Sequence, residues 1–180
     1  QTKSRLFTNS VVFLGHVIGA DGVRPNPAKV RAIVDMPAPT TVSGVRSLLG
    51  SFNFWRRYMK DYARMSAPLI YLTRKDVKFH WNATHQSSFD AMKRMLTTAP
   101  LLSYPDVSVG APPFVVYTDG SREGLGAVIM QNDKPIEYAS RALRSHELKW
   151  HSTHWEAAAI VFAVQTLSLI HISEPTRHEC

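Results

Sequence analysis

The chain has 180 residues, of which 44% are hydrophobic and 19% are charged, and its formal net charge is +7. This composition is typical of a folded globular protein and excludes a disordered chain. No apolar run approaches the ~20 residues of a membrane span and the start lacks a signal-peptide pattern, so we expect a protein that stays inside the cell, away from membranes. The single cysteine, Cys180, fits a reducing compartment.

The charge is unevenly distributed along the chain. Residues 1–110 hold 15 Lys and Arg against 6 Asp and Glu, a net charge of +9, whereas residues 111–180 carry −2. A basic surface favours a polyanion, because each phosphate that it neutralises releases counterions. We therefore expect the first part to bind nucleic acid, although solvated surfaces also vary in charge without any ligand.

Residues 11–24 predict a β-hairpin. Two apolar runs flank Asp21 and Gly22, a pair that readily adopts the positive φ of a tight turn. Asn26 and the proline after it predict the start of a helix, with Asn26 as its N-cap. We expect that helix to end before Pro37, since a residue that precedes proline avoids the helical conformation.

Three further helices are predicted before residue 100. One follows Thr41 and has an apolar face, although Gly50 could bend or break it. Shorter periodic patterns indicate a helix over residues 68–72 and another after Thr84. The apolar positions of the first of these helices are Val45, Leu48, Leu49, Phe52, Trp55 and Tyr58.

The pattern changes from helices to strands near residue 110, where prolines and a glycine indicate a connector between domains. An apolar strand over residues 114–117 leads into Asp119. Two more strands and a helix that carries Glu156 follow. The first strand is apolar on both faces, which is typical of a strand that is covered on both sides.

Taken in order, these segments resemble the reverse transcriptase of gypsy-type LTR retrotransposons over about residues 11–166. Each block alone is weakly specific, and their order and spacing together make the resemblance strong. The family commonly has Ala at the position of Gly120, and bulkier apolar residues than those at 157–159. The matching blocks are Phe13-Leu14-Gly15-His16-Val17-Ile18, Val45-Arg46-Ser47-Leu48-Leu49-Gly50, Phe54-Trp55-Arg56-Arg57-Tyr58, Phe79-His80-Trp81, Ala99-Pro100-Leu101-Leu102, Tyr117-Thr118-Asp119-Gly120-Ser121 and Ala139-Ser140-Arg141-Ala142-Leu143, with Glu147, Trp150 and Glu156.

The resemblance implies an α+β fold in which a β-hairpin and a helical thumb or connection precede a truncated RNase H-like mixed sheet with a packed helix. Residues 1–24 would be the end of the palm with the primer-grip hairpin, and residues 25–105 the thumb or connection. Residues 106–166 would form a partial RNase H-like domain. Residues 167–180 are similar to a translated sequencing adapter, so we expect no function from them.

The resemblance also implies that Asp119 and Glu156 are catalytic residues and Mg²⁺ ligands. A complete ribonuclease H domain uses two magnesium ions, and magnesium needs several converging oxygen ligands. Asp119, at a strand end, would bridge both ions, and Glu156 would hold one of them. From the residues alone, Asp119 could be a turn residue and Glu156 a solvated helix residue. His151 and His154 could face one way on a helix, but nothing completes a tetrahedral zinc site with them.

For nucleic acid, the resemblance implies contacts from two segments. Phe13, Leu14 and Gly15 would belong to the primer grip, and basic residues of the helical part would contact phosphates. The expected partners are the primer–template duplex, an RNA–DNA hybrid and the remainder of the polyprotein. An ordinary solvated helix face is the alternative for the basic residues, which are Arg46, Arg56, Arg57 and Lys60.

The resemblance puts the polymerase motif before Gln1 and the third ribonuclease H carboxylate after Thr166. We therefore expect RNA-directed DNA polymerase and ribonuclease H activities in the parent polyprotein, and inactivity of this chain by itself. We also expect an exposed hydrophobic sheet edge at residues 114–117. The alternative is a non-catalytic RNase H-like remnant that binds nucleic acid or has a structural role.

Overall fold

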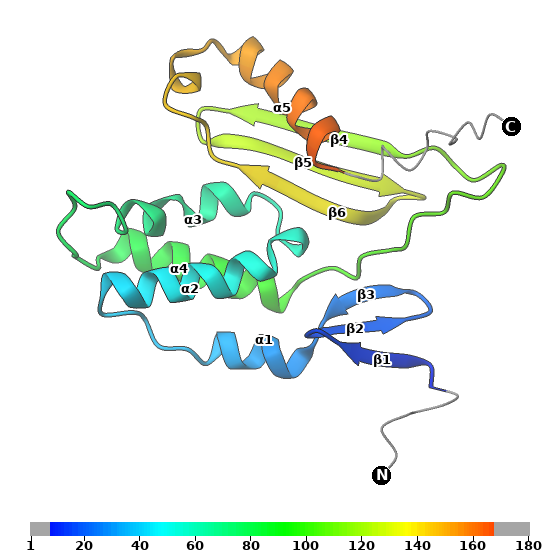
Figure 1. Cartoon of the computed structure of the whole chain (residues 1–180), viewed down its shortest axis with the longest axis horizontal. Coiled ribbons are helices and arrows are strands. Elements are labelled where there is room, and N and C mark those ends of the chain that lie inside the picture. Colours follow the sequence, from blue (N-terminus) through cyan, green and yellow to red (C-terminus); the bar gives the residue numbers. More distant parts are fainter. Residues whose placement is uncertain (1–7, 168–180) are drawn as a thin grey trace, which may run out of the picture.

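The computed structural model describes residues 8–167, in which two small antiparallel sheets lie on either side of a group of helices (Figure 1). The first sheet has the order β1-β2-β3 and comprises β1 (Ser10–Phe13), β2 (His16–Gly19) and β3 (Gly22–Pro25). The predicted turn at Asp21 and Gly22 joins β2 to β3. The first apolar run of the predicted hairpin forms two strands, β1 and β2, so residues 10–25 are a three-stranded meander rather than a two-stranded hairpin.

Four α-helices follow the first sheet: α1 (Pro27–Val34), α2 (Val42–Phe54), α3 (Tyr62–Tyr71) and α4 (Ala83–Thr97). The predicted cap at Asn26 is present, since its side chain accepts a hydrogen bond from the Ala28 amide. The Thr41 hydroxyl caps α2 in the same way and accepts a hydrogen bond from the Gly44 amide. None of the helices in the described range is both long and apolar enough to cross a membrane.

Three helix boundaries differ from the prediction. The apolar face predicted over residues 45–58 is divided, because α2 ends at Phe54 and the short 3₁₀ turn η1 (Arg56–Tyr58) redirects the chain. The helix predicted over residues 68–72 begins earlier, since Pro68 is accommodated inside α3. Thr84 lies within α4 because Asn82 caps that helix, accepting hydrogen bonds from its second and third amides.

The helices and the first sheet share one hydrophobic core, and the connector after α4 ties both sheets to it. Leu102 and Val23 exchange backbone hydrogen bonds of 2.8 and 2.9 Å, and the Ser103 amide donates to the Pro135 carbonyl at 2.8 Å. The fully buried core side chains include Val45, Phe52, Tyr58, Met59, Leu69, Phe89, Met92, Leu96 and Leu102.

The second sheet has the order β4-β5-β6, with β4 (Val115–Ser121), β5 (Gly124–Gln131) and β6 (Lys134–Arg141). The helix α5 (Ser152–Thr166) covers one face, and α3 and η1 pack on the other face (Figure 1). A second, smaller core lies under α5 and includes Ala127, Ile129, Ile136, Ala163 and Leu167.

The strand β4 is at the edge of the described sheet and pairs only with β5 there. Its apolar side chains are not covered as the sequence pattern suggested, because Val115 is 44% and Tyr117 57% exposed. The expected hydrophobic edge is therefore present within residues 8–167.

Gly120 allows α5 to lie directly against β4. A Cβ at this position would overlap the carbonyl oxygen of Trp155 and would lie 2.7 Å from the Glu156 amide nitrogen. Both neighbours are backbone atoms, which cannot yield without a shift of the helix. A residue without a side chain is thus required here for the close approach.

A buried ion pair fixes the segment that enters α5. The Arg141 guanidinium makes two hydrogen bonds of 2.7 and 2.8 Å to the Glu147 carboxylate, which also accepts one from the Arg144 amide. The Trp155 indole donates to the Glu147 carbonyl at 2.7 Å. The hydrogen bonds from Arg141 hold the pKa of the buried Glu147 at about 2, and this carboxylate is therefore charged throughout the neutral range.

Replacing Gly120 by Ala should destabilise the protein by roughly 2–4 kcal/mol, because the added methyl group meets backbone on α5. Urea unfolding measures the change. Gly50→Ala is the matched control: the added Cβ would meet no heavy atom within 4 Å, so the same change inside α2 should stabilise by up to about 1 kcal/mol. Equal unfolding midpoints for wild type and Gly120→Ala would contradict the close approach.

Glu147→Gln should lower the free energy of unfolding by roughly 3 kcal/mol at pH 7 and by clearly less at pH 3. The folded-state pKa of Glu147 is about 2 against an ordinary 4.5, so the stabilisation is complete above pH 4.5 and is lost as the pH falls towards 2. Urea unfolding at both pH values measures the difference. Glu123→Gln, which removes an exposed pair with Arg64, should cost less than about 1 kcal/mol. A difference that does not change with pH would argue against the ion pair.

Candidate functional site

Asp119 lies near the end of β4 and pairs with Gly126 of β5. Side chains alternate between the two faces of a strand, and directly paired residues share a face. Because Gly120 faces α5, Asp119 and Gly126 face the other side, towards α3. This assignment agrees with Asp61 at the start of α3, whose Oδ1 lies 3.3 Å from where a Cβ on Gly126 would be. The Asp119 side chain is exposed.

Glu156 lies in the second turn of α5 and is also exposed. The contact at Gly120 brings its backbone against the end of β4 that carries Asp119. The helix, however, covers the face of the sheet opposite to Asp119. The structure thus brings strand β4 and helix α5, which carry the two carboxylates, into direct contact at Gly120.

The carboxylates of the described residues do not by themselves form a complete magnesium site. Between residues 8 and 167, no group of three or more His, Cys, Asp or Glu side chains could hold a metal ion. A pair of magnesium ions needs several converging oxygen ligands. Asp119 and Glu156 could therefore supply only part of such a ligand set.

Asp119 instead has near neighbours that the sequence did not indicate. A cavity of about 120 Å³ on its face of the sheet is lined by Lys60, Asp61, Tyr117 and Tyr138, as well as by Asp119 itself. Asp61 and Asp119 are 58 residues apart along the chain. No spacing or motif connects them, because they meet only through the packing of α3 on the second sheet.

Three of the four predicted basic residues lie close together along the chain, and the fourth lies apart from them. Arg56, Arg57 and Lys60 lie in η1 or just after it, and all three are exposed. Arg46 lies in α2, ten residues before Arg56 along the chain. Its guanidinium donates a hydrogen bond to the Thr73 carbonyl at 3.0 Å, so at least one of its hydrogen-bond donors is used within the protein.

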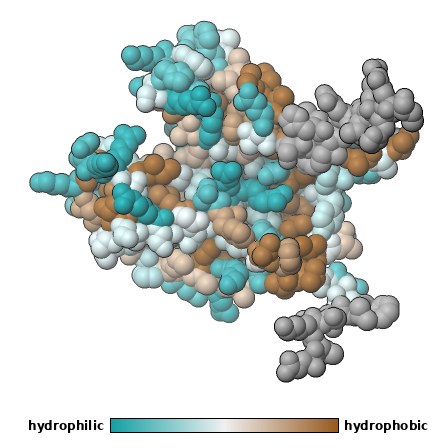
Figure 2. Space-filling model, in the orientation of Figure 1, coloured by the Kyte–Doolittle hydropathy of each residue, from teal (hydrophilic) through white to brown (hydrophobic). Residues whose placement is uncertain are grey.

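The predicted primer-grip residues form the β1–β2 turn, where Leu14 and Gly15 have φ of 47° and 82°. This turn packs on the end of α2, since a Cβ on Gly15 would lie 3.4 Å from Trp55 and 3.5 Å from Phe54. Phe13 and Leu14 are 59% and 72% exposed. Hydrophobic side chains gather on the surface over the first sheet, brown in Figure 2. The turn therefore lies beside η1 and its arginines.

His16 connects this turn to the helices, a role that the sequence did not indicate. Its Nδ1 is hydrogen-bonded to the Tyr58 hydroxyl at 2.8 Å, and its ring stacks on Phe54 with the centroids 5.2 Å apart. Burial and the charge of Arg57 lower the pKa of His16, so that the imidazole is neutral near pH 7. Burial raises the pKa of Tyr58 to about 12.

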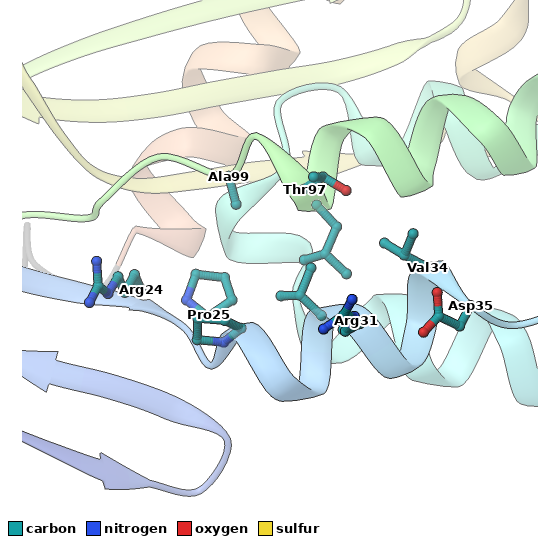
Figure 3. A pocket seen from close by; sticks show the side chains of 10 residues that line it. Arg24, Pro25, Arg31, Val34, Asp35, Thr97 and Ala99 are labelled. Carbon is teal, nitrogen blue, oxygen red and sulfur yellow. The ribbon is translucent and has the colours of Figure 1, made fainter.

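A cleft of about 430 Å³ lies elsewhere, between β3, α1 and the end of α4 (Figure 3). Val34 and Ala99 contribute apolar lining, and Arg24, Arg31 and Asp35 contribute charged groups. None of the predicted site residues lines this cleft. Cavity volume alone would therefore not have located Asp119.

Comparison with known proteins assigns the part of the chain that contains the second sheet and α5 to a known family. Residues 81–176 match the family described as "RNase H-like domain found in reverse transcriptase". The chain is 37% identical over 165 residues to the retrovirus-related Pol polyprotein from transposon 297 of Drosophila melanogaster, covering 91% of this chain and 15% of that protein. It is 33% identical over 179 residues to the Pol polyprotein from the transposon gypsy of the same organism, covering 93% and 17%. The chain thus spans less than a fifth of these curated relatives.

The fold of this chain is also similar to solved structures of a viral reverse transcriptase. The foamy viral protease-reverse transcriptase in complex with an RNA/DNA hybrid aligns with a TM-score of 0.81 and 25% identity, over 96% of this chain and 24% of that one. The same viral protein in complex with dsDNA aligns with a TM-score of 0.75 and 24% identity, over 92% and 35%, which shows the common fold. Since the family match covers more than half of the sequence, this chain belongs to the family of RNase H-like domains found in reverse transcriptases.

Proposed function

We propose that this chain is part of a retrotransposon Pol polyprotein that synthesises DNA on RNA and degrades the RNA of the resulting hybrid. In this proposal the first sheet and the helices bind the primer–template duplex and the RNA–DNA hybrid, and the second sheet carries part of the ribonuclease H site. The remainder of the polyprotein completes both active sites. Such a protein would act inside the cell, in a cytoplasmic particle or in the nucleus.

The observation that carries the proposal is the arrangement around Gly120. An aspartate on a strand and a glutamate on the helix that packs directly on that strand are the two groups that the family resemblance identifies as catalytic. The likeness to a reverse transcriptase in complex with an RNA/DNA hybrid supports the choice of ligand. The exposed basic residues of η1 support it as well, since they suit phosphates.

The proposed division of the chain follows its two hydrophobic cores. The first core joins the palm end (residues 1–24) to the thumb or connection (25–105), and the second belongs to the partial RNase H-like domain (106–166). The family match starts at residue 81 and so also includes α4. The proposed adapter-derived tail, residues 167–180, lies outside the described residues except for Leu167.

Divalent metal is the cofactor that this chemistry requires. Magnesium, when bound, would stabilise the charge on the attacking and leaving oxygens of the phosphodiester. We propose that Asp119 and Glu156 would be metal ligands, with further ligands from the rest of the polyprotein. The present chain would then bind hybrid without cleaving it.

A second candidate function is a non-catalytic RNase H-like module that binds nucleic acid or has a structural role. The observation that favours it is that residues 8–167 contain no group of three or more His, Cys, Asp or Glu side chains that could hold a metal ion. The uninterrupted gene distinguishes the two functions. Intact carboxylate motifs on both flanks support the enzyme, and their loss supports the non-catalytic module.

Asp119→Asn and Glu156→Gln, each introduced into the polyprotein encoded by the uninterrupted gene, should reduce magnesium-dependent cleavage of the RNA strand at least roughly 100-fold, because each removes a metal ligand. Gel analysis of a labelled RNA–DNA hybrid measures cleavage, and a filter-binding assay should show little change in hybrid affinity. Asp21→Asn, in the turn of the first sheet, is the control and should cleave normally. Full cleavage by both site variants would refute the assignment.

Binding of the 180-residue chain to a hybrid should weaken steeply as salt rises. Arg56→Ala and Arg57→Ala should each reduce the slope of log affinity against log salt by about one, because each removes a phosphate contact. Arg31→Ala, at the separate cleft, is the matched control and should leave the slope unchanged. An affinity that is independent of salt in the wild type would remove the phosphate-contact proposal.

A further inference from the structure

The cleft of about 430 Å³ between β3, α1 and the end of α4 contains none of the residues to which the proposed function assigns a role (Figure 3). Its volume lies within the roughly 300–1,000 Å³ that is usual for small-molecule sites. Apolar side chains of α1, of α4 and of the segment after α4 form its floor, and these are Val30, Val34, Leu96 and Ala99. The cleft is thus large enough and apolar enough to hold a small organic molecule.

The cleft lies beside a helix that is fastened at both ends. At the start of α1, the Asn26 amide donates a hydrogen bond of 2.9 Å to the carbonyl of Gly15. Just after the end of α1, the Lys93 ammonium donates one of 2.6 Å to the Met36 carbonyl. Between these two points the helix presents short, half-buried valine side chains to the cleft. The cavity is therefore formed before any ligand binds, and binding requires no rearrangement of the backbone.

Two arginines against one carboxylate give the lining of the cleft a net positive charge. Arg24 of β3 and Arg31 of α1 are exposed, and in the part of the chain that the structure describes neither forms an ion pair. A guanidinium without a partner suits a carboxylate, which it can bind through two parallel hydrogen bonds. Figure 3 shows Arg24 and Asp35 on opposite sides of Arg31. An anionic group is therefore expected between the two arginines, away from Asp35.

We propose that this cleft binds a small carboxylate with an apolar body, such as a medium-chain fatty acid. The carboxylate lies between Arg24 and Arg31, and the apolar body packs on the floor of the cleft. Octanoate has about ten non-hydrogen atoms and fills roughly 300 Å³ if each takes about the 30 Å³ of a water molecule. It therefore fits the volume of the cleft. The inference is independent of the proposed function, because none of the predicted site residues lines the cleft.

Titration of the 180-residue chain with octanoate, followed by NMR of isotope-labelled valine methyl groups, tests the position of the site. The methyl signals of Val30 and Val34 should shift to saturation, with a Kd of roughly 0.1–1 mM for a ligand of this size. Val11 and Val12 are exposed on the first sheet and serve as internal controls for non-specific apolar contact. Shifts of the two control valines that equal or exceed those of Val30 and Val34, or no saturable shift at all, would overturn the inference.

A charge-deleting variant and a neutral ligand test the recognition of the carboxylate in the same titration. Arg31→Ala should weaken octanoate binding roughly 10-fold, because it removes a charged hydrogen-bond donor. Lys29→Ala removes an exposed charge from the same helix outside the cleft, so it is the matched control and should bind as the wild type does. Octan-1-ol, which has the same chain without the charge, should bind to the wild type roughly 10-fold more weakly than octanoate.

Both replaced side chains are exposed, so thermal unfolding should be the same for the variants and the wild type. Equal affinities of octanoate and octan-1-ol, or of the wild type and Arg31→Ala for octanoate, would overturn the inference. The cleft would then be assigned to neutral apolar groups, such as side chains of the remaining polyprotein.

Discussion

The contact between Gly120 and the backbone of α5 is the constraint on which the candidate site depends. It sets the distance between helix and strand, and thereby the position of Glu156 relative to the end of β4. The buried pair of Arg141 and Glu147 supports it by fixing the chain where it enters the helix. The site is thus organised first through backbone packing, and the carboxylates are placed as a consequence.

The two faces of the second sheet have different roles. The face under α5 is a packed core, whereas the other face receives the loop at Lys60 and Asp61 and retains an open cavity at Asp119. Through η1 this loop continues to the end of α2, on which the turn at Gly15 packs. The proposed nucleic-acid contacts therefore lie on connected elements, from the first sheet to the second (Figure 1).

Local signals predicted much of the fold. The cap at Asn26 acts where the sequence predicts it, because a capping side chain and the amide it binds are only a few residues apart. The predicted helix boundaries were wrong where burial of side chains competes with local conformational preference. At Trp55 the chain leaves α2 but keeps its aromatic side chains in the core, and at Pro68 a helix passes through a residue that usually ends one.

The sequence by itself determined the order of the elements and the family, because these depend on short motifs and their spacing, and it predicts two carboxylates as metal ligands. Only the tertiary structure decided that Asp119 faces the helices while Glu156 lies beyond the other face, and that Lys60 lies near Asp119. Alternation along β4 states which residues share a face, but not what covers that face. That choice is made by the packing of α3 and α5, through contacts between segments far apart in the chain.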